Sequence, residues 1–138
     1  MNSQTVITIV ILLLLGLLFF VAYLNSKKIP VRKKEKIFEK IELLGAQINS
    51  DEEYARRDAV IRLDNVLGKA LNIRYGNEDP CGDNLKLAKK LFDKKLYQQV
   101  WDAHKVRNNI VHDDENISKT QALEIYKIYK LAVKHILK

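Results

Sequence analysis

The sequence predicts an all-α protein in which a single N-terminal transmembrane helix is followed by an antiparallel bundle of four to five helices. Three observations lead to this prediction. No charged residue occurs before position 27, although charged residues make up 30% of the 138 residues. Beyond that point, apolar residues recur at three- and four-residue steps, and no segment alternates as a strand would. The chain also has only five Gly and two Pro, too few for a turn-rich β sandwich.

Residues 6–24 form a run of 19 residues without a charge. As a helix this run is roughly 28 Å long, close to the hydrocarbon thickness of a bilayer. A cleaved signal peptide would have a basic start, a shorter apolar run and a small residue at its cleavage site. The chain instead begins MNSQT and has Leu24 where the small residue should be. We therefore expect residues 1–26 to remain attached as a membrane anchor.

A basic juxtamembrane segment, residues 27–36, follows the anchor. It carries six of the Lys and Arg residues against one Glu, a net charge of +5, and the rest of the chain contributes the other +2. By the positive-inside rule, the N-terminus lies outside and the C-terminal domain is cytoplasmic. The six cations are expected to contact anionic headgroups of the bilayer. They are Lys27, Lys28, Arg32, Lys33, Lys34 and Lys36.

The remaining residues, 37–138, are predicted to form one helical domain. The first helix, over residues 31–48, starts after Pro30 and has an apolar stripe at helical spacing. Ser50 and Glu53 have the spacing of a capping box, which predicts a second helix over residues 51–74.

The second half of this domain has the same character. Gly76, Pro80 and Gly82 predict a loop over residues 75–84, followed by a short helix over 85–92 and a longer one over 94–112. Ser118 and Gln121 predict a capping box at the start of the last helix. Cys81 is the only cysteine, which excludes an internal disulfide framework.

The chain has no glycine-rich phosphate loop, no G-x-S-x-G, no H-E-x-x-H and no C-x-x-C, so most enzyme classes are excluded. The remaining candidate site lies in the helix over residues 94–112. On a helical projection Arg107 falls within the apolar arc, and Asn108 and His112 continue it as a polar edge. An Arg binds anionic oxygens and a His moves protons near neutral pH, which suits a phosphodiester.

One other interpretation of these residues remains open. Arg, Asn and His near a helix C-terminus also satisfy free carbonyls and complement the helix dipole. A metal site is not predicted, because His104 and His112 are eight residues apart, about 12 Å along one helix. Neither Asp113 nor Cys81 completes a known ligand spacing with them. No cofactor is predicted.

The string RNNIVH, residues 107–112, resembles the R-N-x-x-x-H form of the signature of HEPN domains, a family of nucleotide-binding helical domains. A preceding helix with Trp101, an acidic turn after His112 and a closing amphipathic helix match as well, so the resemblance covers residues 37–138. It implies a homodimer in which the two motifs face each other. Active members resemble metal-independent endoribonucleases, whereas many others resemble binding or scaffold modules.

The resemblance also implies roles for the site residues. His112 would take the 2′-hydroxyl proton or protonate the leaving oxygen, and Arg107 would stabilise charge developing on phosphorus. Asn108 would orient the substrate or the imidazole. The products would be a 2′,3′-cyclic phosphate and a 5′-hydroxyl. His104 lies outside the motif and is interpreted as a supporting residue.

The leading hypothesis is therefore a membrane-anchored HEPN-like protein that cleaves or binds RNA, with a toxin or defence role. Its expected partners are the bilayer, a second copy of the chain, RNA, and an antitoxin or other protein. The alternative is a non-catalytic dimerisation or scaffold module at the membrane. A stalk subunit of a larger complex is a third hypothesis, disfavoured because the apolar stripes keep no strict seven-residue period beyond the first helix.

Overall fold

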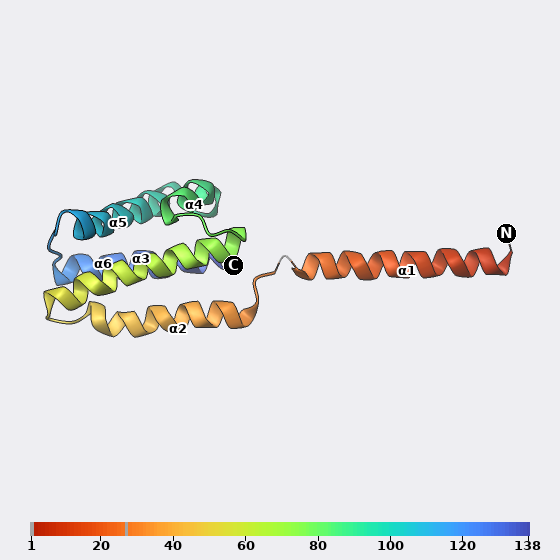
Figure 1. Cartoon of the computed structure of the whole chain (residues 1–138), viewed down its shortest axis with the longest axis horizontal. Helices are drawn as coiled ribbons and strands as arrows, with labels where there is room; N and C mark the ends of the chain where they lie inside the picture. Colours follow the sequence, from red (N-terminus) through yellow and green to blue (C-terminus); the bar gives the residue numbers. More distant parts are fainter. Residues whose placement is uncertain (1, 27) are drawn as a thin grey trace. The chain divides into compact units, whose positions relative to one another are not determined.

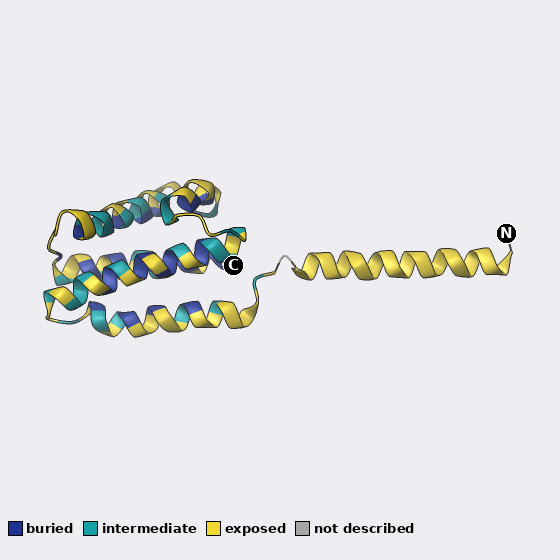
Figure 2. Cartoon of the chain, viewed as in Figure 1, coloured by how far each residue is buried: buried dark blue, intermediate teal, exposed yellow. Residues whose placement is uncertain are grey.

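The computed structural model describes residues 2–26 and 28–138 and divides into two compact units, Met1–Pro30 and Val31–Lys138. The first unit holds one helix, α1 (Ser3–Ser26), in which every residue is exposed (Figure 2). Among the described residues it provides the chain's one segment that is long and apolar enough to cross a membrane. Its length and composition suit either a membrane anchor or a signal sequence.

The second unit is a bundle of helices. The long helices α2 (Val31–Ile48), α3 (Glu53–Tyr75), α5 (Lys94–His112) and α6 (Lys119–Ile136) run in alternating directions along the bundle (Figure 1). The short helix α4 (Cys81–Leu87) and a 3-10 turn, η1 (Ala88–Leu91), connect α3 to α5. No strand occurs among the described residues, which confirms the all-α prediction.

Helix α3 is the centre of the bundle, because it packs against α2, α4, α5 and α6. Its buried side chains recur at three- and four-residue steps, as helical packing requires, and the other helices turn similar stripes toward it (Figure 2). The largest fully buried side chains include Ile41, Ile48, Leu67, Leu71 and Tyr129. The predicted apolar faces are therefore the faces that form the core.

The predicted basic segment does not form a separate element. Helix α2 starts at Val31, so Arg32, Lys33, Lys34 and Lys36 lie in its first two turns, within the second unit. Lys28 is exposed in the connection before α2, and Lys27 lies outside the described residues. The compact unit thus begins six residues before the predicted domain boundary at residue 37.

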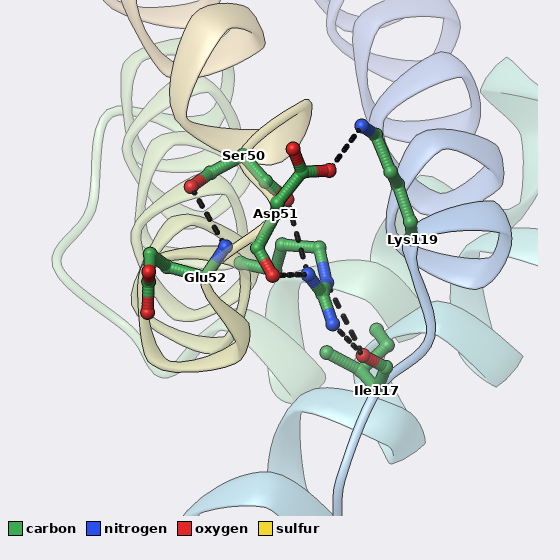
Figure 3. Close-up of polar contacts among 6 residues, drawn as sticks. Ser50, Asp51, Glu52, Ile117 and Lys119 are labelled. Carbon is green, nitrogen blue, oxygen red and sulfur yellow. Dashed lines mark hydrogen bonds and ion pairs between the residues drawn. The ribbon is translucent and has the colours of Figure 1, made fainter.

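The predicted capping box at the start of α3 is wrong. The helix begins at Glu53, and the hydroxyl of Ser50 accepts a hydrogen bond from the backbone N–H of Glu52 (3.1 Å) instead (Figure 3). The carbonyls of Ser50 and Asp51 accept hydrogen bonds from Nη1 of Arg56 (3.0 and 2.8 Å). The guanidinium of Arg56, in the first turn of α3, therefore binds the carbonyls of this turn, in place of a side-chain cap.

The same guanidinium joins two connections that are distant in sequence. Arg56 also donates to the carbonyl of Ile117 (3.2 Å), and Lys119 forms an ion pair with Asp51 (2.8 Å) (Figure 3). Ile117 is buried, so the segment before α6 is fixed on the start of α3.

The loop after α3 is shorter than predicted. Gly76, at a φ of 65°, ends α3 by donating its N–H to the carbonyl of Asn72 (2.8 Å). The next helix begins at Cys81 rather than Leu85, because the carbonyl of Pro80 accepts from the N–H groups of Asp83 and Asn84 (3.0 and 3.1 Å). Proline suits this place because it has no N–H that the helix start would leave unpaired.

We expect Ser118→Ala to destabilise the protein by about 1 kcal/mol, the usual cost of losing an N-cap. The Ser118 side chain accepts from the backbone N–H of Gln121 (3.2 Å), and the Gln121 side-chain oxygen accepts from the Ser118 N–H (3.1 Å), so the predicted capping box of α6 is confirmed. Circular dichroism of the full chain in mild detergent during unfolding measures the loss. Thr120→Ala, an exposed change in the same turn, should cost less than about 0.5 kcal/mol; equal losses would contradict the cap.

Candidate functional site

A pocket of about 870 Å³ opens between α3, α4 and α5. Side chains from α3 form one wall, the start of α4 forms the second, and one face of α5 forms the third. The polar and aromatic lining residues are Asp64, Asn65, Lys69, Asn72, Asp79, Cys81, Asp83, Lys86, Trp101, His104, Arg107 and Asn108. Three of the predicted site residues, His104, Arg107 and Asn108, therefore lie together in one cavity.

A buried carboxylate lies at the base of this pocket. Asp64 is only 2% exposed, and its Oδ1 accepts a hydrogen bond from the hydroxyl of Tyr129 on α6 (2.8 Å). Nδ1 of His104 lies 2.8 Å from the same oxygen. Since a buried carboxylate is costly without partners, these two contacts account for its position in the core. The carboxylate joins α3, α5 and α6 at one point.

The other oxygen of Asp64 faces Arg107. Nε of Arg107 lies 3.6 Å from Oδ2 and is a buried donor with no hydrogen-bond partner among the described residues, so this is an ion pair rather than a hydrogen bond. Nη1 donates to the side-chain oxygen of Asn108 (2.9 Å). The Arg107 side chain is 25% exposed, which makes it accessible from the pocket while one edge remains against the carboxylate.

His112 is the predicted site residue that the structure does not bring to this pocket. It is the last residue of α5, it is exposed, and it is absent from the pocket lining. The projection had placed Arg107 within the apolar arc, and the ion pair with Asp64 is the partner that such an arginine needs.

Asp64 and Tyr129 are the members of the site that sequence reasoning did not single out. Asp64 follows Val60 by four residues and precedes Leu67 by three, so it lies on the apolar stripe of α3. A lone carboxylate at such a position signals a buried partner. Tyr129 lies on the buried face of α6, and the partner of its hydroxyl comes from α3, which the spacing within α6 does not reveal.

The rim of the pocket is held by asparagine side chains. Asn84 is fully buried, donates to Asn77 (2.8 Å) and accepts from it (2.9 Å), which secures the loop before α4. Gly68 of α3 faces the start of α4, where a Cβ added at this position would lie 3.4 Å from Cβ of Cys81, about van der Waals contact.

Asp64, Cys81 and His104 each offer one ligand atom, and these atoms lie within 4.8 Å of one another. The spacing argument considered a different set, His104 with His112, Asp113 or Cys81, and did not include Asp64. Burial and the charge of Asp64 raise the pKa of the Cys81 thiol, which keeps it protonated near neutral pH. Arg107 lies beside the same carboxylate and repels cations. The arrangement is therefore a hydrogen-bonded cluster with a guanidinium at its edge.

The pocket is not strongly charged overall. Its lining includes the cations Lys69, Lys86 and Arg107 and the anions Asp64, Asp79 and Asp83. Lys86 pairs with Asp83 (2.9 Å), and Asp64 offsets Arg107. A ligand would be selected here by the placement of a few groups rather than by a broad positive potential.

No protein-family model, no curated protein and no solved structure matches this chain. The resemblance to HEPN domains therefore stays a prediction that depends on residues 107–112 and their helical setting.

We expect the Cys81 thiol to react with iodoacetamide at pH 8 at least about tenfold more slowly in the folded chain than in the unfolded chain, because the thiolate is the reactive form. Burial raises the pKa of Cys81 in the folded state. The thiol thus contributes stability below its unfolded pKa of about 8.5, and this contribution falls as the pH rises above that value. Mass spectrometry with and without denaturant measures the two rates; the single cysteine makes the assignment unambiguous. Equal rates would show that Cys81 is freely ionised.

Proposed function

We propose that the chain is a membrane-tethered HEPN-like module that binds RNA and cleaves it without a metal ion. The observation that carries this proposal is the placement of Arg107. Its Nε edge lies against the buried Asp64, its Nη1 group is bonded to Asn108, and the side chain lines an open pocket.

The remaining donors of Arg107 suit a phosphodiester. A guanidinium carries five N–H groups in a rigid fork that matches the geometry of phosphate oxygens. Nη2 makes no hydrogen bond to the described part of the protein, so its two N–H groups are free for a ligand. Asn108 adds an amide beside them, and Lys69 provides a second cation on the pocket wall. An anionic oxygen bound there would have charge-assisted hydrogen bonds.

The proposed reaction needs an imidazole near the bound phosphate. The HEPN resemblance assigns this part to His112, which is exposed at the end of α5. In a homodimer with facing motifs, as the resemblance implies, the second copy would bring its own His112 to the pocket of the first. The pocket lining has equal numbers of cations and anions, so it would neutralise few phosphates of an RNA chain. Counterion release, which grows with the number of phosphates contacted, would then contribute little to the affinity.

We also propose that α1 is retained as a membrane anchor, with the bundle on the cytoplasmic side. α1 has 24 residues without a charge, and no Lys or Arg precedes it. Exposed cations follow it, with Arg32, Lys33 and Lys36 on the surface of α2. These support the positive-inside orientation and contact with anionic lipids.

A second candidate function is a non-catalytic scaffold. It is favoured by the same buried carboxylate, because Asp64 joins α3, α5 and α6 whether or not a ligand binds. In a scaffold Arg107 would serve only to neutralise Asp64. This function predicts a stability loss for Arg107 variants without any effect on RNA.

We expect Arg107→Ala to reduce cleavage of single-stranded RNA by at least about 100-fold, because it removes the group that stabilises charge on phosphorus. The full chain in detergent micelles is incubated with labelled RNA in EDTA, and 2′,3′-cyclic phosphate ends are measured. Arg62→Ala serves as the matched control, since Arg62 is an exposed arginine of α3 outside this pocket. Thermal melting reports stability in parallel. Equal cleavage by the wild type, Arg107→Ala and Arg62→Ala would reject the catalytic role of Arg107. A lowered melting temperature of Arg107→Ala without any change in cleavage would support the scaffold function.

We expect a reporter fused after Lys138 to be protected from external protease in intact cells, whereas one fused before Met1 is digested. Six cations follow the apolar segment and residues 1–5 carry none, a distribution that favours a cytoplasmic C-terminal side. Replacing Lys33, Lys34 and Lys36 with Gln should lower the fraction of chains with this orientation. Full-length chain released from membranes, or protease access to the C-terminal reporter, would contradict the anchor or its direction.

A further inference from the structure

We infer that His104, supported by Asp64, is the imidazole that moves the proton in this pocket, so that each single copy of the chain holds a complete site. This inference depends on the proposed RNA cleavage and names a different residue from the one that the HEPN resemblance implies. Three features of the structure carry it: the contact of Nδ1, the surroundings of Nε2, and the position of Arg107.

The contact with Asp64 determines which nitrogen of His104 is basic. Nδ1 lies 2.8 Å from Oδ1 of Asp64. An ionised carboxylate can only accept, so Nδ1 carries the hydrogen and Nε2 of the neutral ring has the free lone pair. The hydroxyl of Tyr129 donates to the same oxygen (2.8 Å), so it holds the carboxylate from α6. Asp64 thereby orients the imidazole and fixes its tautomer.

The His104 side chain lies on the pocket wall and is 13% exposed. No described group forms a hydrogen bond with its Nε2. Gly82 of α4 also approaches it, since a Cβ added there would lie 3.5 Å from Nε2. A larger side chain there would extend over this nitrogen. Trp101 meets the ring edge-on, with 5.8 Å between centroids, and fixes its plane from within α5.

Arg107 lies in the same cavity as this nitrogen. His104 precedes it by three residues, so the two side chains are neighbours on one face of α5. Both contact the same carboxylate, His104 through Oδ1 and Arg107 at Oδ2. An anionic oxygen bound by Nη2 of Arg107 would therefore lie beside a group able to accept a proton. His112 is exposed beyond the pocket and has neither contact.

The proposed step balances without a metal or a redox partner. Nε2 of His104 takes the proton of the RNA 2′-hydroxyl as its oxygen attacks the adjacent phosphorus. The new bond joins phosphorus to the 2′-oxygen, and the bond from phosphorus to the 5′-oxygen breaks. The leaving 5′-oxygen takes a proton from water, and the imidazolium returns its proton to solvent. Arg107 stabilises the charge on the phosphorus oxygens throughout.

Imidazole rescue tests the inference on the full chain in detergent micelles. We expect His104→Ala to lower the rate of RNA cleavage by about 100-fold or more, the usual contribution of a general base, and added imidazole to restore a substantial part of it. Added imidazole would fill the cavity left by the His104→Ala substitution and act as the base. If His104 were only structural, imidazole would not restore the rate of cleavage. His135→Ala, a histidine of α6 outside the pocket, is the matched control.

Further variants keep the inference falsifiable if His104→Ala folds poorly. Asp64→Asn keeps the volume but alters the hydrogen bonding of Nδ1, so it should slow cleavage, and imidazole should not restore the rate because the His104 ring still fills its place; thermal melting reports the stability of this variant in parallel. Loss of cleavage in His112→Ala but not in His104→Ala would overturn the inference and leave the proposed function intact. Loss in His104→Ala that imidazole does not restore, together with a lowered melting temperature, would also overturn it. A wild-type chain without cleavage would reject the proposed reaction itself.

Discussion

The buried carboxylate of Asp64 is the interaction on which the polar part of this protein depends. Two of its partners, His104 and Arg107, come from α5, and the third, Tyr129, comes from α6. A carboxylate in the core would be strongly unfavourable without them, and each of them would lose its own partner without it. The packing of α3, α5 and α6 and the geometry of the pocket therefore depend on the same set of contacts.

The basic residues of the chain fall into two groups, those beside the apolar segment and those that line the pocket. Most of the net charge of +7 lies in residues 27–36, beside the apolar segment, where it suits orientation at a membrane. The pocket carries as many acidic as basic side chains, so a ligand there would depend on how Arg107, Asn108 and His104 are placed. High overall basicity and the candidate site are thus independent features of the chain.

Helical periodicity predicted the bundle well because an apolar stripe needs only a neighbouring surface to pack against. The helix starts at Ser50 and Pro80 were predicted less well. At Ser50 the local capping pattern lost to Arg56, which binds the carbonyls of this turn and also reaches the distant Ile117. At Pro80 the helix began earlier because the Pro80 carbonyl accepts from two following N–H groups. The contact of Arg56 with Ile117 depends on how separate segments pack, which local spacing does not encode, whereas the bonds to Pro80 are those of a helical turn that the Gly and Pro residues had masked.

The sequence by itself determined the apolar N-terminal helix, the amphipathic faces of the bundle, and the presence of Arg107 on an apolar face with polar groups beside it. Only the tertiary structure decided which imidazole shares a cavity with that arginine. Asp64 precedes His104 by 40 residues and Tyr129 by 65. Periodicity states which face of a helix turns inward, whereas the groups that meet there depend on how separate helices pack together.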